Sequence, residues 1–584
     1  MKRLLALLLC LVMVVSVMAG CGKKDEEDKG AIIRTYMTSN IYNFDPIYAH
    51  IDDAATKIMG MVYEGLFTIN AKGKVEKALC KDYEIIEDEE NNIYKMEVTI
   101  NKTGWSDGRE VAVDDIIFAW KRILDPEFTC AAAPMLFDVK NAKNYKNGDC
   151  SPDDVGLYSL DTKTFEIYFD GPINYDLFIE NLASPFLVPL REDILSKAEQ
   201  WASNVAIMVS NGPFAVRSFN PGEKMALQRN SYYYRNIEKD ADDKVVKPYR
   251  LYIDLRTDAN EQIAAYKNGE VFYNSEIALE ARGEWKSSVK TVDMQNVHTY
   301  YFNTNNKIFA DAKVRQALSM ALDREAIADL VVFAEAATGL ITEGVFDTSR
   351  KNSFREEGGD LIETTGDIDG AKALLKGVTL EEKSFTIIVR NNDVDVAIAE
   401  YAKDVWKKLG FDVKIKKLEA EKKVTANEYE VYVDLFEQAF MAGDFDVAAV
   451  DLQMLSTDAF ATLAGFAVGY AGTALDLAHP EEGGWDIKPG VTGYNSEEYN
   501  AKIDAAFNEK LDRAVKTKYL HEAEEILLKD MPVMPLVTLQ NAYVSNKAFS
   551  GFSFDYYGCP VMTKAKLKNY EAYTNVEELA KEEQ

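Results

Sequence analysis

Several short stretches of the chain alternate between apolar and polar residues with a period of two. Residues 94–100 show this most clearly, and the polar turn 87–92 separates them from a second such stretch at 83–86. A period of two is typical of a strand with one buried face, so these stretches predict a β-hairpin. Further apolar runs predict strands at 31–36, 385–389, 413–415 and 445–450.

Other stretches follow the helical period. Between 314 and 322 the apolar residues recur at i, i+3, i+4, i+7 and i+8, and Asp311 is placed to cap this helix. Asp114 or Asp115 opens a second helix, and a capping box opened by Asn495 predicts a third. Because predicted strands and helices alternate along the chain, we expect an α/β fold.

The N-terminus has the pattern of an export signal. Lys2 and Arg3 precede the apolar run Leu4–Val17, which is short for a membrane span but suits a signal peptide. Met18-Ala19-Gly20 then leads to Cys21, and small residues before a cysteine at this place resemble a bacterial lipobox. We therefore expect a signal peptide at 1–20, lipidation of Cys21, a polar tether at 21–30 and a cell-membrane, outward-facing location. The alternative is an ordinary signal peptide with an incidental cysteine.

Length and charge narrow the classes of function. A chain of 584 residues is too long for one core, so two or three lobes are expected. It carries 66 Lys and Arg against 96 Asp and Glu, a formal net charge of −30. A nucleic-acid partner is excluded on this ground, because phosphates would be repelled over most of the surface.

The residues that usually carry catalysis or metal binding form no recognisable motif. No P-loop, HExxH or GxSxG sequence is present, and the four histidines are scattered singly. Apart from Cys10 and Cys21, the cysteines are Cys80, Cys130, Cys150 and Cys559, with no CxxC pair. A Cys130–Cys150 disulfide and free thiols are both open. We expect no metal, no cofactor and no enzyme, with a secreted hydrolase as a remote alternative.

Four segments in order resemble the family 5 extracellular solute-binding proteins, the oligopeptide- and dipeptide-binding receptors of ABC importers. The segments begin with Tyr63-Glu64-Gly65-Leu66-Phe67, and Trp105-Ser106-Asp107-Gly108 follows with its helix to Pro126. Asn211-Gly212-Pro213-Phe214 is the third, and 300–324, with VRQALSMALDR, is the fourth. Each is weak alone and has a plain reading as a turn or an amphipathic helix, but together they span most of the chain.

The resemblance implies a two-lobed α/β clamp of the periplasmic-binding-protein type (type II, cluster C) with an inserted subdomain. Such a clamp closes by hinge motion around its ligand. The expected parts are lobe I at 31–69, 206–293 and 539–584, the inserted subdomain at 70–205, and lobe II at 294–538.

In peptide-binding members of this family, two backbone stretches line the cleft and pair with the peptide main chain. By the resemblance, they fall here on His50, Ile51 and Asp52, and on Asp451, Leu452 and Gln453.

The family's aspartate for the peptide α-ammonium is replaced by Leu455. Either Asp451 or Asp458 takes that role after a loop shift, or a free N-terminus is not recognised. A blocked peptide, a peptide held internally and a non-peptide solute are then the open ligands.

The implied function is that of the substrate-binding subunit of an ABC importer, a monomer that captures peptides and delivers them to permease subunits with their ATPases. The alternatives are a receptor of the same fold for another solute, such as an oligosaccharide, and a binding protein used in signalling or adhesion.

Overall fold

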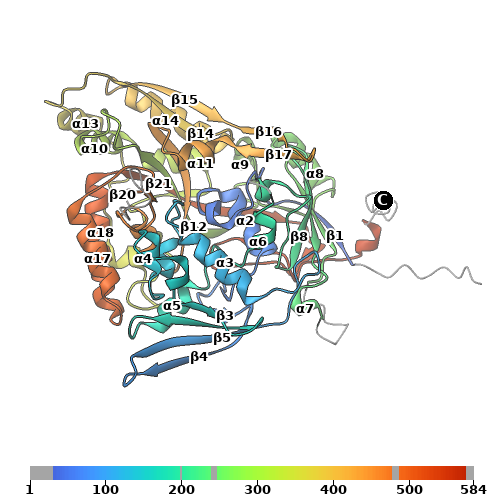
Figure 1. Ribbon diagram of the computed structural model, residues 1–584. Helices are drawn as coiled ribbons and strands as arrows, with labels where there is room; N and C mark the ends of the chain where they lie inside the picture. Colours follow the sequence, from blue (N-terminus) through green and yellow to red (C-terminus); the bar gives the residue numbers. More distant parts are fainter. Residues whose placement is uncertain (1–29, 198–199, 238–245, 476–485, 574–584) are drawn as a thin grey trace, which may run out of the picture.

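The computed structural model describes residues 30–197, 200–237, 246–475 and 486–573 (Figure 1). The predicted signal peptide and Cys21 lie outside the described residues. Among the helices that are described, none combines the length and apolar character needed to cross a membrane. The expected α/β fold is confirmed: the strands form one large sheet, one four-stranded sheet and several two-stranded ribbons, with helices packed around them.

The first lobe is built on one half of the large sheet. Its strands run in the spatial order β11 (Tyr273–Asn274), β1 (Ile32–Tyr36), β10 (Arg250–Asp254), β9 (Lys224–Arg229) and β8 (Phe214–Asn220). β1 is parallel to both of its neighbours, so it is central and buried on both faces, as its apolar sequence requires. The helices of this lobe are α2 (Asp53–Val62), α8 (Ala259–Lys267) and α9 (Leu279–Trp285).

The second lobe is built on the other half of the sheet. Its strands are β15 (Asp412–Leu418), β14 (Ser384–Arg390), β18 (Val447–Gln453), β12 (Lys290–Phe302), β21 (Val533–Ser545) and β13 (Ala334–Ala336). Its helices include α10 (Ala312–Ala321), α11 (Arg324–Val331), α13 (Ile368–Leu374) and α14 (Asp393–Lys407), which lie with β14 and β15 at the top of Figure 1. The pair α17 (Glu497–Asn508) and α18 (Arg513–Asp530) closes one side.

Two long antiparallel strands join the lobes. β12 pairs with β18 and β21 in the second lobe, while the far end of β21 pairs with β11 in the first. The β12–β21 register shifts between Asp293 and Val297 and again between His298 and Thr299, and an interrupted ladder of this kind is where a pair of strands bends most easily. The connection between the lobes is thus continuous but has two places where its ladder is interrupted.

A four-stranded antiparallel sheet forms a separate layer at the bottom of Figure 1, with the order β4 (Cys80–Asp88), β5 (Ile93–Ile100), β7 (Thr164–Phe169) and β6 (Leu157–Ser159). The predicted hairpin is confirmed as β4–β5. Trp105 is fully buried beside this sheet, and its indole N–H donates to Asp115 Oδ2 at 2.9 Å. The WSDG segment is therefore scaffold.

Helix starts follow the predicted capping chemistry with two corrections. Asp311 caps α10 as expected, with its carboxylate accepting from Lys313 N at 2.9 Å. α3 (Val113–Ile123) begins before Asp114, and Asp115 reaches back to the N–H of Ala112. α17 is capped by Ser496 and not by Asn495, because the Ser496 hydroxyl accepts from Tyr499 N. Neither correction moves the helix as a whole.

Two apolar clusters make up most of the core. One runs through the first lobe, the four-stranded sheet and the interface with the second lobe, and the other fills the space between the second-lobe sheet and its helices. Trp406 of α14 is fully buried in the second cluster, where its N–H donates to Leu318 O. Cys130 and Cys150 are both free, so the disulfide alternative is wrong.

Candidate functional site

A cavity of about 410 Å³ lies between the lobes. Its first-lobe wall comes from the segment after β1, the start of α2 and the segment after β11, with Asp52, Lys57 and Glu276 among its residues. Its second-lobe wall comes from the β14–α14 loop and from β18, with Arg390 and Asp451 among its residues. A volume of this size is in the range that small-ligand pockets occupy.

The first predicted stretch reaches this cavity through a helix start. Asp45-Pro46 opens a 3-10 helix, η1 (Pro46–Ile51), and does not continue a strand. Asp52 follows in an extended conformation and caps α2, accepting hydrogen bonds from Ala54 N and Ala55 N. Ile51 and Asp52 line the cavity, whereas His50 lines only a neighbouring pocket.

The second predicted stretch lies on β18. Asp451, Leu452 and Gln453 pair with β12, but β14 pairs with β18 only at Val447 and Ala448. The opposite edge of β18 at 451–453 is therefore outside the described ladders. Asp451 lines the cavity, while the Gln453 side chain is fully buried and donates to Gln295 O at 2.6 Å.

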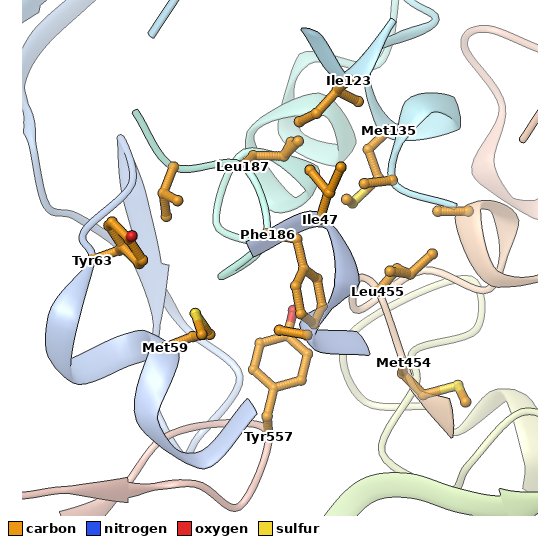
Figure 2. Packing of buried hydrophobic residues seen from close by; sticks show 14 of the residues in the cluster. Ile47, Met59, Tyr63, Ile123, Met135, Phe186, Leu187, Met454, Leu455 and Tyr557 are labelled. Carbon is orange, nitrogen blue, oxygen red and sulfur yellow. The ribbon is translucent and has the colours of Figure 1, made fainter. Parts of the chain in front are cut away.

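The position of Leu455 is filled by packing. Figure 2 shows Leu455 in the same apolar cluster as Ile47 and Phe186, and its side chain is fully buried. Its carbonyl accepts from the Ser184 hydroxyl at 2.7 Å. Leu452 and Leu455 line a second, apolar pocket of about 50 Å³ with His50, Tyr301 and Phe466.

Asp458 does not belong to the described wall of the main cavity. Its side chain is buried and accepts from Phe460 N at 2.8 Å, which is a local turn contact. Of the two acids considered as substitutes at the missing ammonium position, only Asp451 lies on the cavity.

Asp451 is tied to a buried histidine. His298 Nδ1 lies 2.5 Å from Asp451 Oδ1 and 4.0 Å from Asp395 Oδ1. Burial raises the pKa of Asp451, but the His298 imidazolium outweighs it and holds that pKa below its usual value. The pKa of His298, which burial lowers, is raised overall by Asp451. The two shifts together favour the charged forms of both groups.

Asp395, in the first turn of α14, is the unusual member of this group. Burial, followed by repulsion from Asp451, raises the pKa of Asp395 to about 7. Its Oδ1 has no hydrogen-bond partner among the described residues. The ligand atoms of His298, Asp395 and Asp451 lie within 4.8 Å of one another, so these are the residues that could hold a metal ion.

The first-lobe wall carries a compact charge triad. Lys57 Nζ lies 2.7 Å from Asp53 Oδ2 and 2.7 Å from Glu276 Oε2. The pKa of Lys57 is raised because these carboxylates outweigh its burial, and burial raises the pKa of Asp53 to about 6. The Lys57 ammonium is thus shared between two carboxylates.

Charged and aromatic groups also meet across the lobes. Arg390 of β14 forms an ion pair with Asp434, and its other nitrogen lies 4.0 Å from Asp52 of the first lobe. Tyr42 lies against Tyr432 with ring centroids 5.9 Å apart, and Tyr432 belongs to the ribbon strand β17 (Glu430–Asp434). The lobes are in contact beside the cavity.

Sequence reasoning missed most of the charged residues of the site. Lys57, His298, Arg390 and Asp395 are separated by up to hundreds of residues, and none belongs to a motif. One signal was available: Asp451 ends the apolar run 447–450 just where a buried strand should continue. An acid at that place needs a partner, which β12 supplies opposite it as His298.

A cavity between two lobes joined by continuous strands, with mixed charges on both walls, defines a ligand-binding clamp. Residues 74–470, about two thirds of the chain, match the model of the bacterial extracellular solute-binding proteins, family 5. The chain belongs to this family, whose members are binding proteins and not enzymes.

Named relatives agree with this assignment. The oligopeptide-binding protein OppA of Bacillus subtilis (strain 168) is 24% identical over 572 residues, covering 94% of this chain and 95% of that protein. The probable deoxycholate-binding periplasmic protein YgiS of Escherichia coli (strain K12) is 24% identical over 518 residues, covering 84% of this chain and 86% of that protein. The solved structure of Listeria monocytogenes OppA bound to peptide superposes with a TM-score of 0.73 at 20% identity, covering 92% of this chain and 99% of that one. The two-lobed fold is thereby confirmed.

Proposed function

We propose that this chain is the substrate-binding subunit of an ABC importer and that it captures short peptides in the cavity between its lobes. The observation that carries the proposal is the position of Asp52 and Asp451 on opposite walls of one cavity. By the family resemblance, both belong to the stretches expected to line the cleft in peptide-binding members. The names of relatives such as the Bacillus subtilis OppA support the same ligand class.

The backbone offers a way to hold a peptide of any sequence. The edge of β18 at 451–453 that pairs with no strand of the described chain accepts an extended peptide as an added strand. Closure about the register shifts in β12 then brings Asp52 and the start of α2 over the other side of the peptide. Main-chain hydrogen bonds supply the affinity, and the cavity walls supply the selectivity.

Leu455 sets this site apart. It stands where, by the family resemblance, peptide-binding members carry the aspartate for the peptide α-ammonium, and its side chain is packed in the core. A non-peptide solute is therefore the second candidate, and the deoxycholate-binding name of one relative is the observation that favours it.

The proposed lipid anchor rests on the sequence pattern before Cys21, and the proposed partners rest on the family resemblance. Cys21 carries the lipid anchor that holds the protein on the outer face of the cell membrane, and two or more acyl chains make such an anchor stable. The partners are permease subunits with their ATPases, and the binding protein acts as a monomer. The lobe and subdomain bounds given from the sequence stand as part of this proposal.

Calorimetry with a pool of short peptides tests the proposal. Thr257 is exposed on the cavity wall, so Thr257→Trp narrows the cavity without disturbing the core, and Thr257→Ser is the matched control. We expect binding by the wild type and by Thr257→Ser, and at least tenfold weaker binding by Thr257→Trp. If Thr257→Trp binds peptides as tightly as the wild type does, the ligand binds outside this cavity.

A further inference from the structure

We infer that the cavity between the lobes selects ligands with a cationic group, an ammonium or a guanidinium, which Asp395 and Asp451 hold at the second-lobe wall. This inference rests on the proposed function, because it names the chemistry of the ligand that the same cavity binds.

The charges on the cavity wall are strongly unequal. The basic side chains are Lys57, Arg282 and Arg390. Eight acidic side chains line the same space: Asp52, Asp53, Glu276, Asp393, Asp395, Glu419, Asp434 and Asp451. The ratio of acidic to basic side chains is therefore higher on the cavity wall than in the whole chain, which has 96 acids and 66 bases. This is so although acids in a cavity are costlier to bury than acids on a surface.

The basic side chains are already engaged. Lys57 is shared by Asp53 and Glu276, and Arg390 is paired with Asp434. Arg282 donates to the carbonyl oxygens of Ile277 and Val331, so it neutralises no carboxylate through a direct contact. The acids at the β18 and α14 end of the cavity therefore have His298 as their nearest cation.

His298 satisfies one of the two acids at that end. It sits 2.5 Å from Asp451 Oδ1 but 4.0 Å from Asp395 Oδ1, and the latter atom has no hydrogen-bond partner in the described chain. The Asp395 side chain is only 4% exposed. An unpartnered carboxylate oxygen that is buried on a ligand cavity is a place where a ligand donor gains most.

Asp395 is faced by charged or titratable groups from each neighbouring strand. Asp451 and Tyr300 lie nearby on β18 and β12, and the Tyr300 hydroxyl also lacks a partner among the described atoms. Asp451 raises the pKa of Asp395, whereas His298 and Arg390 lower it. The balance raises the pKa of Asp395 to about 7, and a ligand cation beside it would favour the ionised form.

A metal ion fits this place less well than an organic cation. Two ligand atoms of a tetrahedral zinc ion with bonds of ~2.0–2.1 Å sit about 3.3 Å apart. The His298–Asp451 contact of 2.5 Å is shorter and is that of a hydrogen bond, which a metal would have to break. An ammonium or guanidinium binds to the outer side of this pair and leaves it intact.

Paired peptides test the inference. The probes are Ala-Ala-Lys-Ala-Ala and the same peptide with norleucine in place of lysine, each with a free and with an acetylated N-terminus. The four peptides have the same length and the same apolar side-chain stem, so their affinities differ only through the cationic groups. Comparing lysine with norleucine tests the side-chain ammonium, and comparing the free with the acetylated N-terminus tests the α-amine. We expect each cation-bearing peptide to bind at least tenfold more tightly than acetylated norleucine peptide at pH 7.

The variants tie this preference to the site. Asp395→Asn should reduce the preference to threefold or less, while Asp404→Asn, which removes an exposed acid from the same helix α14, should leave it unchanged. A second readout needs no variant: calorimetry in two buffers of different ionisation enthalpy should show net proton release when a cationic peptide binds at pH 7 and none with the acetylated norleucine peptide.

The failures of the two proposals are distinguishable. If no peptide binds but spermidine does, in an Asp395-dependent way, the cation inference stands and the peptide proposal falls. If all four peptides bind equally and without proton release, the peptide proposal stands and the inference is overturned. It is also overturned if the lysine preference requires added Zn²⁺ and disappears with a chelator, or if neither peptides nor spermidine bind.

Discussion

Asn43 Nδ2 donates a hydrogen bond to Glu437 Oε1 at 2.7 Å and joins the two lobes beside the cavity. Glu437 lies in α15 (Leu435–Met441) of the second lobe, and Asn43 lies between β1 and η1 in the first. Burial, followed by repulsion from Asp434, raises the pKa of Glu437 to about 8. The carboxyl is therefore mostly protonated at pH 7, so the bond between the lobes does not depend on a charge.

The first prediction concerns this contact. Glu437→Gln keeps a neutral acceptor for Asn43, and the lobes should stay together as in the wild type. Glu437→Ala removes the acceptor and should shift the unliganded protein toward a more open shape, since one hydrogen bond contributes about 1 kcal/mol. Small-angle scattering measures this as a larger radius of gyration. An alanine variant as compact as the glutamine variant would show that the bond does not hold the lobes.

The second prediction concerns Leu455. Because its side chain is fully buried near Ile47 and Phe186, Leu455→Ala should lower the free energy of unfolding by about 2–5 kcal/mol. Leu511 is 59% exposed, so Leu511→Ala should change it by less than about 0.5 kcal/mol. Urea denaturation compares the two. Equal effects would contradict the packing that removes position 455 from the ligand site.

The third prediction uses the raised pKa of Asp395. The folded state keeps this proton up to a pKa of about 7, while the unfolded state loses it near 3.8. The folded state thus binds more protons between these values, and stability from this group falls as pH rises through that window. Asp395→Asn removes the effect, so the variant should gain about 3 kcal/mol relative to the wild type between pH 5 and pH 8. Chemical denaturation at both pH values measures the gain, and a constant difference would refute the assigned pKa.

The fourth prediction concerns the anchor. If Cys21 is lipidated, Cys21→Ala should release the protein into the medium or leave the signal peptide uncleaved. Metabolic labelling with a fatty acid and fractionation of the cells report both outcomes. A variant that is still labelled and still bound to the membrane would rule out the lipobox interpretation.

One physical reason explains why the sequence predicted several helices and strands but missed most of the charged residues of the cavity. The 94–100 strand and the helix capped by Asp311 depend on neighbours in the chain, so their periodicity is visible without a structure. The pair His298 and Asp451 depends on the register of β12 against β18, which joins residues far apart in sequence. Asp395 looked like an ordinary first-turn acid of a helix, and only the packing of α14 against β14 and β15 makes it a cavity residue.

The same reason explains Leu455. By the family resemblance, Leu455 stands at the position of a ligand-binding aspartate, but whether an apolar residue there lines a cleft or fills a core depends on segments far away in the sequence. Such a segment supplies Ser184, whose hydroxyl donates to the Leu455 carbonyl, and Phe186, which belongs to the same apolar cluster.

Native mass spectrometry of the protein, purified after exposure to a digest of short peptides, tests the central claim most directly. The account predicts a one-to-one complex that releases an intact peptide on denaturation, with cationic peptides enriched over the supplied mixture. Release of a non-peptide solute, absence of any bound mass, or steady cleavage of the supplied peptides would contradict the claim that this protein binds peptides between its lobes and leaves them unchanged.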